Sequence, residues 1–189
     1  MCSQLRPALV SLILLTVITG LIYPAIVTGV AKVAFAGKAS GSIVMVNGKP
    51  AGSELIGQPF SDPKYFWSRP SATSPVPYAG ENGSGSNLGP INSALIDAVK
   101  QRITVLRAAD PQNQRAIPVD LVTASASGLD PHISVAAAEY QAARVARVRG
   151  MSTEKVEQFV EQSKEGRTLG VLGDERVNVL QLNLALDGH

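Results

Sequence analysis

The sequence predicts an α+β protein in which one transmembrane helix precedes a mostly helical extracytoplasmic domain with a small sheet. Two observations support this prediction. A long uncharged, apolar run near the N-terminus is sufficient to cross a bilayer. The remaining sequence combines helical periodicity with one strong hairpin signal and several proline-rich breaks. The 189 residues are enough for about one domain in addition to the membrane segment.

The apolar run extends from Ala8 to Ala31 without a charged residue. As a helix it would be about 36 Å long, against about 30 Å of hydrocarbon in a bilayer. Thirteen of its residues are Leu, Ile or Val, and together they favour insertion by roughly 4–8 kcal/mol. Its threonines can bond back to the helix, and we expect a local kink at Pro24. We therefore assign residues 8–36 to a transmembrane anchor that follows a cytoplasmic stub, residues 1–7.

A cleaved signal peptide is the alternative. Arg6 would supply its positive region, and Ala34-Phe35-Ala36 resembles a cleavage site. However, the apolar run is about twice as long as the usual 7–15-residue signal segment. We therefore expect the anchor to remain uncleaved.

The orientation follows from the short stub. The positive-inside rule does not decide, because Arg6 precedes the run while Lys32, Lys38 and Lys49 follow it. A very short N-terminal stub is easily left inside. We expect Cys2 on the cytoplasmic side and residues 37–189 outside as a periplasmic domain.

The domain begins with a linker and a hairpin. Gly37 to Ser42 is a Gly/Ser/Ala linker, and Ile43 to Val46 reads as a strand. Asn47-Gly48 is the strongest short hairpin signal, and it predicts a return strand through 54–56. Five prolines then exclude a helix between residues 58 and 78. We expect the aromatic residues of this stretch to pin a long loop onto the core.

Helices dominate the rest of the domain. Pro90 suits the first turn of a helix that continues to about Leu106, and 119–122 reads as a short strand. Ser134 is a good N-cap for a helix that ends at Gly150, and Ser152 can cap another that ends at Gly166. The segment 177–186 fits either a strand or a helix. We favour a helix, with Asn178 as its cap.

Composition excludes several classes of function. The net charge of +2 and the lack of a basic stripe argue against nucleic-acid binding. The single cysteine cannot form an internal disulfide or a zinc site built from four cysteines or from paired cysteines and histidines. Two histidines are too few for a histidine-rich metal site. The loop Asn82–Pro90 resembles a phosphate-binding loop, but it lacks the Gly-Lys-Ser/Thr ending, so we predict an ordered surface loop.

The loop from Thr123 to Ser134 holds the candidate site residues. Ser125 and Ser127 lie close in sequence to His132 and Asp130, although proximity in sequence is not triad geometry. Backbone amides at Ser127 and Gly128 could meet an anion, which makes Ser125, Ser127 and Gly128 the candidates for cofactor binding. An ordinary turn into the helix explains the same composition. We therefore predict no catalytic residue in this loop.

A metal site is not expected either. The acids nearest the loop are Asp120, Asp130 and Glu139, and they are sparse and widely spaced for a metal. Helix capping and surface pairing account for them.

Six segments in this order resemble the KdpC family, the C subunit of the Kdp potassium-transporting ATPase. They are an anchor with Tyr23-Pro24, then 52–58, 65–71, 86–90, 122–134 and 176–184. The resemblance implies a bacterial inner-membrane complex with a channel-like A subunit, an ATP-hydrolysing B subunit and a small F subunit. It also implies a non-catalytic subunit, described as a catalytic chaperone that raises the ATP affinity of the B subunit.

The resemblance and the expected topology conflict over ATP. The loop at Ser127 would lie outside, whereas a P-type ATPase binds nucleotide in the cytoplasm, and no lysine or arginine lies close by in sequence to neutralise phosphate. We expect ATP to act through the complex rather than as a cofactor bound directly by this chain. Two alternatives remain, namely a membrane-tethered periplasmic serine hydrolase and a periplasmic binding module.

Overall fold

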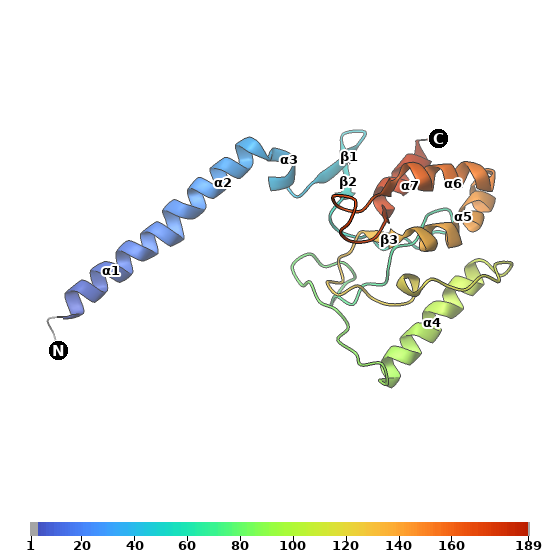
Figure 1. Ribbon diagram of the computed structural model, residues 1–189, viewed down its shortest axis with the longest axis horizontal. Coiled ribbons are helices and arrows are strands. Elements are labelled where there is room, and N and C mark those ends of the chain that lie inside the picture. Colours follow the sequence, from blue (N-terminus) through green and yellow to red (C-terminus); the bar gives the residue numbers. More distant parts are fainter. Residues whose placement is uncertain (1–3, 189) are drawn as a thin grey trace. The chain divides into compact units, whose positions relative to one another are not determined.

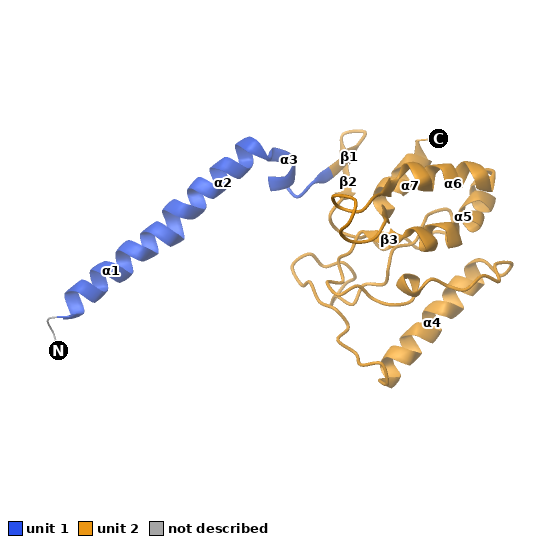
Figure 2. Cartoon of the chain, in the orientation of Figure 1, with its two compact units in different colours: residues 1–43 blue, residues 44–189 orange. Residues whose placement is uncertain are grey.

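The computed structural model describes residues 4–188, so the expected position of Cys2 lies outside the described residues. The chain divides into two compact units, residues 1–43 and 44–189 (Figure 2). The first unit carries the membrane-spanning candidate. The second contains the hydrophobic core and the candidate site residues.

Unit 1 consists mainly of one continuous helix from Leu5 to Ala34 (Figure 1). Its parts are α1 (Leu5–Val17), the π-helical turn η2 (Ile18–Ile22) and α2 (Tyr23–Ala34). None of its residues is buried. The helix is long and apolar enough to span a membrane, as the sequence predicts. It begins three residues before Ala8, because Arg6 and Pro7 are both tolerated in a first helical turn.

The irregularity expected at Pro24 takes the form of the π-helical turn. Proline has no N–H, and its ring crowds the carbonyl group one turn earlier. The turn η2 ends just before Tyr23 and opens the helix at that point. Thr19 satisfies a carbonyl nearby, since its hydroxyl donates to the Leu15 oxygen at 2.7 Å.

The linker is more ordered than the sequence suggests. A short helix, α3 (Ala36–Ala39), follows the break at Phe35. The hairpin then forms from β1 (Ile43–Val46) and β2 (Lys49–Ser53). Asn47 and Gly48 both have positive φ, as the tightest hairpin turns require. The predicted return strand at 54–56 is wrong, because a two-residue turn pairs the chain from Lys49 onward.

Four helices of unit 2 are capped by side chains. They are α4 (Ser93–Ala109), α5 (Val135–Arg149), α6 (Thr153–Gln162) and α7 (Val179–Asp187). Their caps are Asn92, Ser134, Ser152 and Asn178, and each accepts a backbone N–H. The predicted caps of α5, α6 and α7 are confirmed, and Gly150 ends α5 with φ of 67°. The helix predicted after Pro90 is present as α4, but it begins at Ser93 with Asn92 as its cap, so its predicted start at Pro90 is wrong.

Two further predictions are wrong. Residues Val119–Leu121 form a 3-10 turn, η3, in place of a strand. The helix α6 ends at Gln162 instead of Gly166, because β4 (Lys164–Glu165) pairs with β5 (Arg176–Asn178). A third strand, β3 (His132–Ser134), pairs with β5 on its other side, so the antiparallel order is β3-β5-β4.

The core of unit 2 lies where α5, α6 and α7 meet this sheet, and Figure 1 shows the three helices together. Phe66 from the proline-rich stretch is fully buried in it, which confirms that aromatic residues pin this loop. Two buried amides hold the loop backbone. Asn183 donates to Phe66 O at 3.0 Å and accepts from Phe66 N at 2.8 Å. Gln141 bonds both backbone groups of Trp67 in the same way.

A buried arginine completes this attachment. Arg144 is 2% exposed, donates to the carbonyl groups of Pro63 and Tyr65, and lies 4.5 Å from the Trp67 ring centroid. Burial lowers its pKa to about 10. The long loop is thus held by polar bonds to its backbone as well as by Phe66.

Candidate functional site

The Ser/Gly loop before β3 is packed against other loops of unit 2. Ser125 is buried. The carbonyl group of Ser127 accepts from Ser84 N at 2.8 Å, and that of Gly128 accepts from the Ser71 hydroxyl at 2.7 Å. The loop is therefore held from both sides by residues more than 40 positions away in sequence.

Gly128 is required by this packing. Its φ is +68°, and a Cβ there would lie 2.5 Å from Ser84 O and 2.7 Å from the Thr73 methyl group. The backbone amides of the loop have internal partners as well. Gly128 N donates to Ser125 O at 3.3 Å, and Leu129 N donates to the Ser127 hydroxyl at 3.1 Å. The amides of Gly128 and Leu129 are thus bonded within the loop, as in an ordinary turn.

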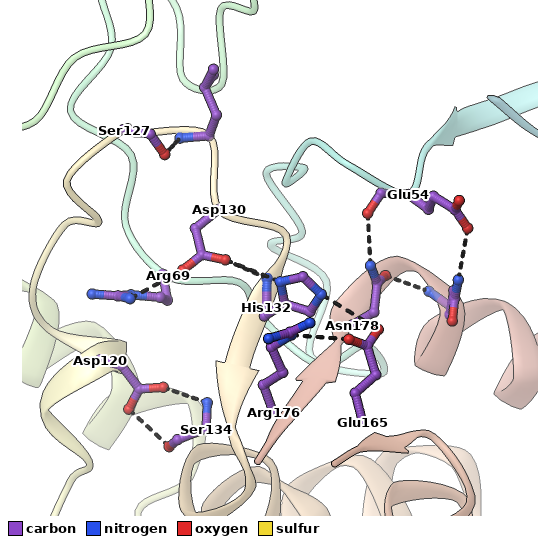
Figure 3. Close-up of polar contacts among 12 residues, drawn as sticks. Glu54, Arg69, Asp120, Ser127, Asp130, His132, Ser134, Glu165, Arg176 and Asn178 are labelled. Atoms are coloured by element: carbon purple, nitrogen blue, oxygen red, sulfur yellow. Dashed lines mark hydrogen bonds and ion pairs between the residues drawn. The ribbon is translucent and has the colours of Figure 1, made fainter. Parts of the chain in front are cut away.

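The serines and the histidine are not paired. Figure 3 shows His132 between Asp130 and Glu165, while the Ser127 hydroxyl accepts from the Leu129 amide. Within residues 4–188, neither Ser125 nor Ser127 bonds to His132. Serine activation needs such a bond to a base, so the arrangement required by the hydrolase alternative is not formed.

The three acids proposed as the sparse metal set serve different structures. Asp120 accepts from the Ser134 amide at 2.7 Å and lies 3.2 Å from its hydroxyl, so it supports the cap of α5. Asp130 accepts from the backbone N–H of His132 at 3.0 Å, which shapes the turn into β3. Glu139 lies apart, on an acidic surface with Glu154 and Glu157. Across the described part of the chain, no three histidine, cysteine or acidic residues form a group that could hold a metal.

Instead, a chain of charged groups crosses the sheet. Arg69 contacts Asp130 at 3.1 Å, and Asp130 contacts the His132 ring at 3.3 Å. The other ring nitrogen lies 3.5 Å from Glu165, which bonds to Arg176 at 2.9 Å. The chain links the proline-rich loop, the turn before β3 and all three strands of the sheet (Figure 3).

The charge of Asp130 depends on this chain. Burial alone would raise the pKa of Asp130. Hydrogen bonds from the side chain and backbone of His132, with the charges of Arg69 and His132, outweigh burial and hold the pKa of Asp130 below its usual range. The carboxylate is therefore ionised at neutral pH.

Sequence reasoning missed Arg69 as a member of this site. It lies 61 positions before Asp130, yet both line a surface hollow of about 550 Å³ together with Ser125 and Ser127. A cation from a distant part of the sequence therefore lies near the loop. It is already paired with Asp130. In the sequence, Arg69 stands out only by its place in the aromatic segment 65–71. Nothing in that segment indicates an ion pair with a distant carboxylate.

Comparisons with known proteins agree with one another. Residues 5–188 match the family model described as "KdpC: K+-transporting ATPase, c chain". The chain is 64% identical to the potassium-transporting ATPase KdpC subunit of Polaromonas naphthalenivorans, over 99% of this chain and 95% of that protein. Subunits of the same name from Sorangium cellulosum and Herpetosiphon aurantiacus are 61% and 62% identical. These alignments cover 100% and 96% of this chain, and 99% and 94% of those proteins.

Proposed function

Because this chain belongs to the KdpC family of the potassium-transporting ATPase, we propose that it is a non-catalytic accessory subunit that stabilises the Kdp complex. The observation that carries this proposal is the identity of 57–64% with KdpC subunits over nearly the whole chain. Its partners would be the channel-like A subunit, the ATP-hydrolysing B subunit and the small F subunit. In this role it would also raise the ATP affinity of the B subunit.

The topology of the chain determines how such an effect on ATP could arise. We place the N-terminus in the cytoplasm, the helix Leu5–Ala34 in the inner membrane and unit 2 on the periplasmic side. ATP binds to the B subunit on the cytoplasmic side, so unit 2 would have no access to it. The effect would then pass through the membrane subunits as a coupling free energy of roughly 1–3 kcal/mol.

The geometry of the Ser/Gly loop supports an indirect effect. Its amides at Gly128 and Leu129 are bonded within the loop, and Arg69 is paired with Asp130. A phosphate would have to break these bonds before it could form hydrogen bonds or ion pairs with the same groups. A hydrolase centred on Ser125 or Ser127 is the less favoured function, because neither hydroxyl bonds to a base.

The test compares Kdp complexes purified with and without this chain. We expect the KM for ATP to be about 5–150-fold higher without it, which corresponds to the coupling free energy above. Calorimetry of the full-length chain alone with MgATP should give no saturable heat. As a matched variant, Ser127→Ala removes the hydroxyl from the loop and should leave the KM for ATP of the full complex unchanged.

Two results would contradict this proposal. Saturable, magnesium-dependent ATP binding by the chain alone, abolished by a bulky residue at Ser127, would make the contact direct and the topology wrong. An unchanged KM for ATP in a stable complex that lacks the chain would remove the effect on ATP altogether.

A further inference from the structure

A surface hollow of about 310 Å³ lies between α4 and the proline-rich loop. We refer to it as the α4 hollow, and its apolar lining comes from three segments. The loop contributes Phe60, Trp67 and Pro70, α4 contributes Val105 and Leu106, and η3 contributes Leu121.

The lining joins the hydrophobic core to the surface. Leu106 and Leu121 are buried members of the core, whereas Val105 is 52% exposed. The hollow is therefore open to solvent although part of its wall is core. Sites for small molecules have this character, with a mostly apolar concave surface of about 300–1,000 Å³ and few polar groups. A hollow at the lower end of that range suits one hydrocarbon chain rather than a folded partner.

Among the described residues, Arg102 is the one charged side chain that lines the hollow. It is half-buried and donates to the Val122 carbonyl group at 2.8 Å. Burial lowers the pKa of Arg102, and Tyr78 acts in the opposite direction. An arginine nevertheless keeps its charge at neutral pH. The hollow therefore combines apolar walls with one positive charge.

This charge has no counter-ion within residues 4–188. Other arginines of unit 2 each pair with a carboxylate, namely Arg69, Arg147, Arg149, Arg167 and Arg176. A partly buried charge that lacks a partner is costly. An anionic group that reached Arg102 would therefore gain an ion pair without displacing a carboxylate of unit 2.

We propose that the α4 hollow binds a single-chain anionic lipid, a fatty acid whose hydrocarbon chain lies against Trp67 and Val105 and whose carboxylate pairs with Arg102. Charge complementarity favours an anion, because the described lining contains a cation and no carboxylate. The apolar walls favour a hydrocarbon chain over a hydrophilic anion such as free phosphate. The helix Leu5–Ala34 is suited to hold the chain at a membrane, which is a source of such lipids. The site does not depend on the effect on ATP proposed above.

Trp67 provides a specific readout, because it is the only tryptophan in the chain. Bromine quenches tryptophan fluorescence only at close approach. The probe is dodecanoate with bromine at its terminal carbon, added to the full-length chain in mild detergent at mildly alkaline pH. We expect saturable quenching of Trp67. The neutral alcohol with the same brominated chain reports non-specific contact with chains in the detergent, and it should quench far less.

Two substitutions on α4 test the role of the cation. Arg102→Gln removes the charge and should raise the concentration of probe at half-quenching by about tenfold or more. Lys100→Gln is the matched control, because Lys100 is an exposed cation on the same helix and does not line the hollow. It should change that concentration by less than about twofold.

A third variant blocks the site without touching the core. Val105→Glu places a carboxylate three residues from Arg102 on the same helix, where it can pair with the guanidinium in place of the lipid. We expect it to abolish saturable quenching. Because Val105 is exposed, its thermal unfolding should match that of the wild type.

Three results would overturn the proposal. The first is quenching of equal strength by the brominated acid and the brominated alcohol. The second is quenching by the acid that does not saturate. The third is saturable quenching that persists with unchanged affinity in Val105→Glu, or in an Arg102→Gln variant that unfolds like the wild type.

Discussion

The anchor helix exposes apolar side chains, whereas α5 buries polar ones. Along Leu5–Ala34 no residue is buried, and Leu12 and Leu21 are more than 60% exposed. In α5, by contrast, even Gln141 and Arg144 are nearly inaccessible. The apolar surface of the anchor finds no cover within its own unit, so lipid is the medium that suits it. The polar groups of α5 tolerate burial because each has bonds to the proline-rich loop.

The largest expected effect is a difference between the two regions in their access to protease. Protease added to intact spheroplasts should digest unit 2 completely and leave a membrane fragment that starts at the N-terminus and includes the anchor. Intact mass should show no cleavage at Ala34-Phe35-Ala36. Full protection of unit 2 would contradict the orientation, and a mature N-terminus at Gly37 would make the anchor a signal peptide.

The next prediction makes the same substitution in both regions. Leu182→Ala in α7 removes a fully buried side chain and should destabilise unit 2 by about 2–5 kcal/mol. Leu14→Ala in the anchor removes a side chain that is 57% exposed and should leave the unfolding of unit 2 unchanged. Urea unfolding of the full-length chain measures both. Equal losses in the two variants would mean that the anchor is part of the domain core.

A smaller effect tests the buried amides. Asn183→Ala leaves the N–H and C=O of Phe66 without their partner and should cost about 1–3 kcal/mol. Gln181→Ala, on the same helix, removes only an exposed side-chain bond to Glu54 and should cost less than about 0.5 kcal/mol. The same urea experiment compares them. If the two losses are alike, the bonds from Asn183 to Phe66 do not help to hold the loop.

Local signals in the sequence predicted the parts of the fold that local chemistry controls. The apolar run, the Asn47-Gly48 turn and the caps at Ser134, Ser152 and Asn178 each act within a few residues. The short strands β3, β4 and β5 have only two or three residues each, so they carry no periodicity. They exist because their partners lie opposite them in space.

The candidate site also combines local contacts, which the sequence predicts, with contacts between distant residues, which it does not. The turn role of Asp130 follows from its own neighbours, and the structure has the bond that this role requires. The contacts of His132 with Glu165, and of Asp130 with Arg69, join residues 33 and 61 positions apart. Such pairs depend on tertiary packing, which a single sequence does not reveal. The candidates Ser125, Ser127 and Gly128 lie in one loop, in which Gly128 N donates to Ser125 O and Leu129 N donates to the Ser127 hydroxyl.

Membership of a working transport complex is the central claim, and co-purification tests it most directly. The full-length chain carrying an affinity tag is extracted in mild detergent from membranes of potassium-limited cells, and the eluted proteins are identified by mass spectrometry. We predict that the A, B and F subunits elute with it in fixed proportion. We also expect Gly20→Leu to reduce their recovery, because a small residue lets another helix approach closely in lipid. Among the described residues, and apart from the local helix backbone, the atom nearest to a Cβ there is the Thr16 methyl carbon at 4.0 Å. Recovery of the chain without any of these subunits, from membranes that contain them, would contradict the account.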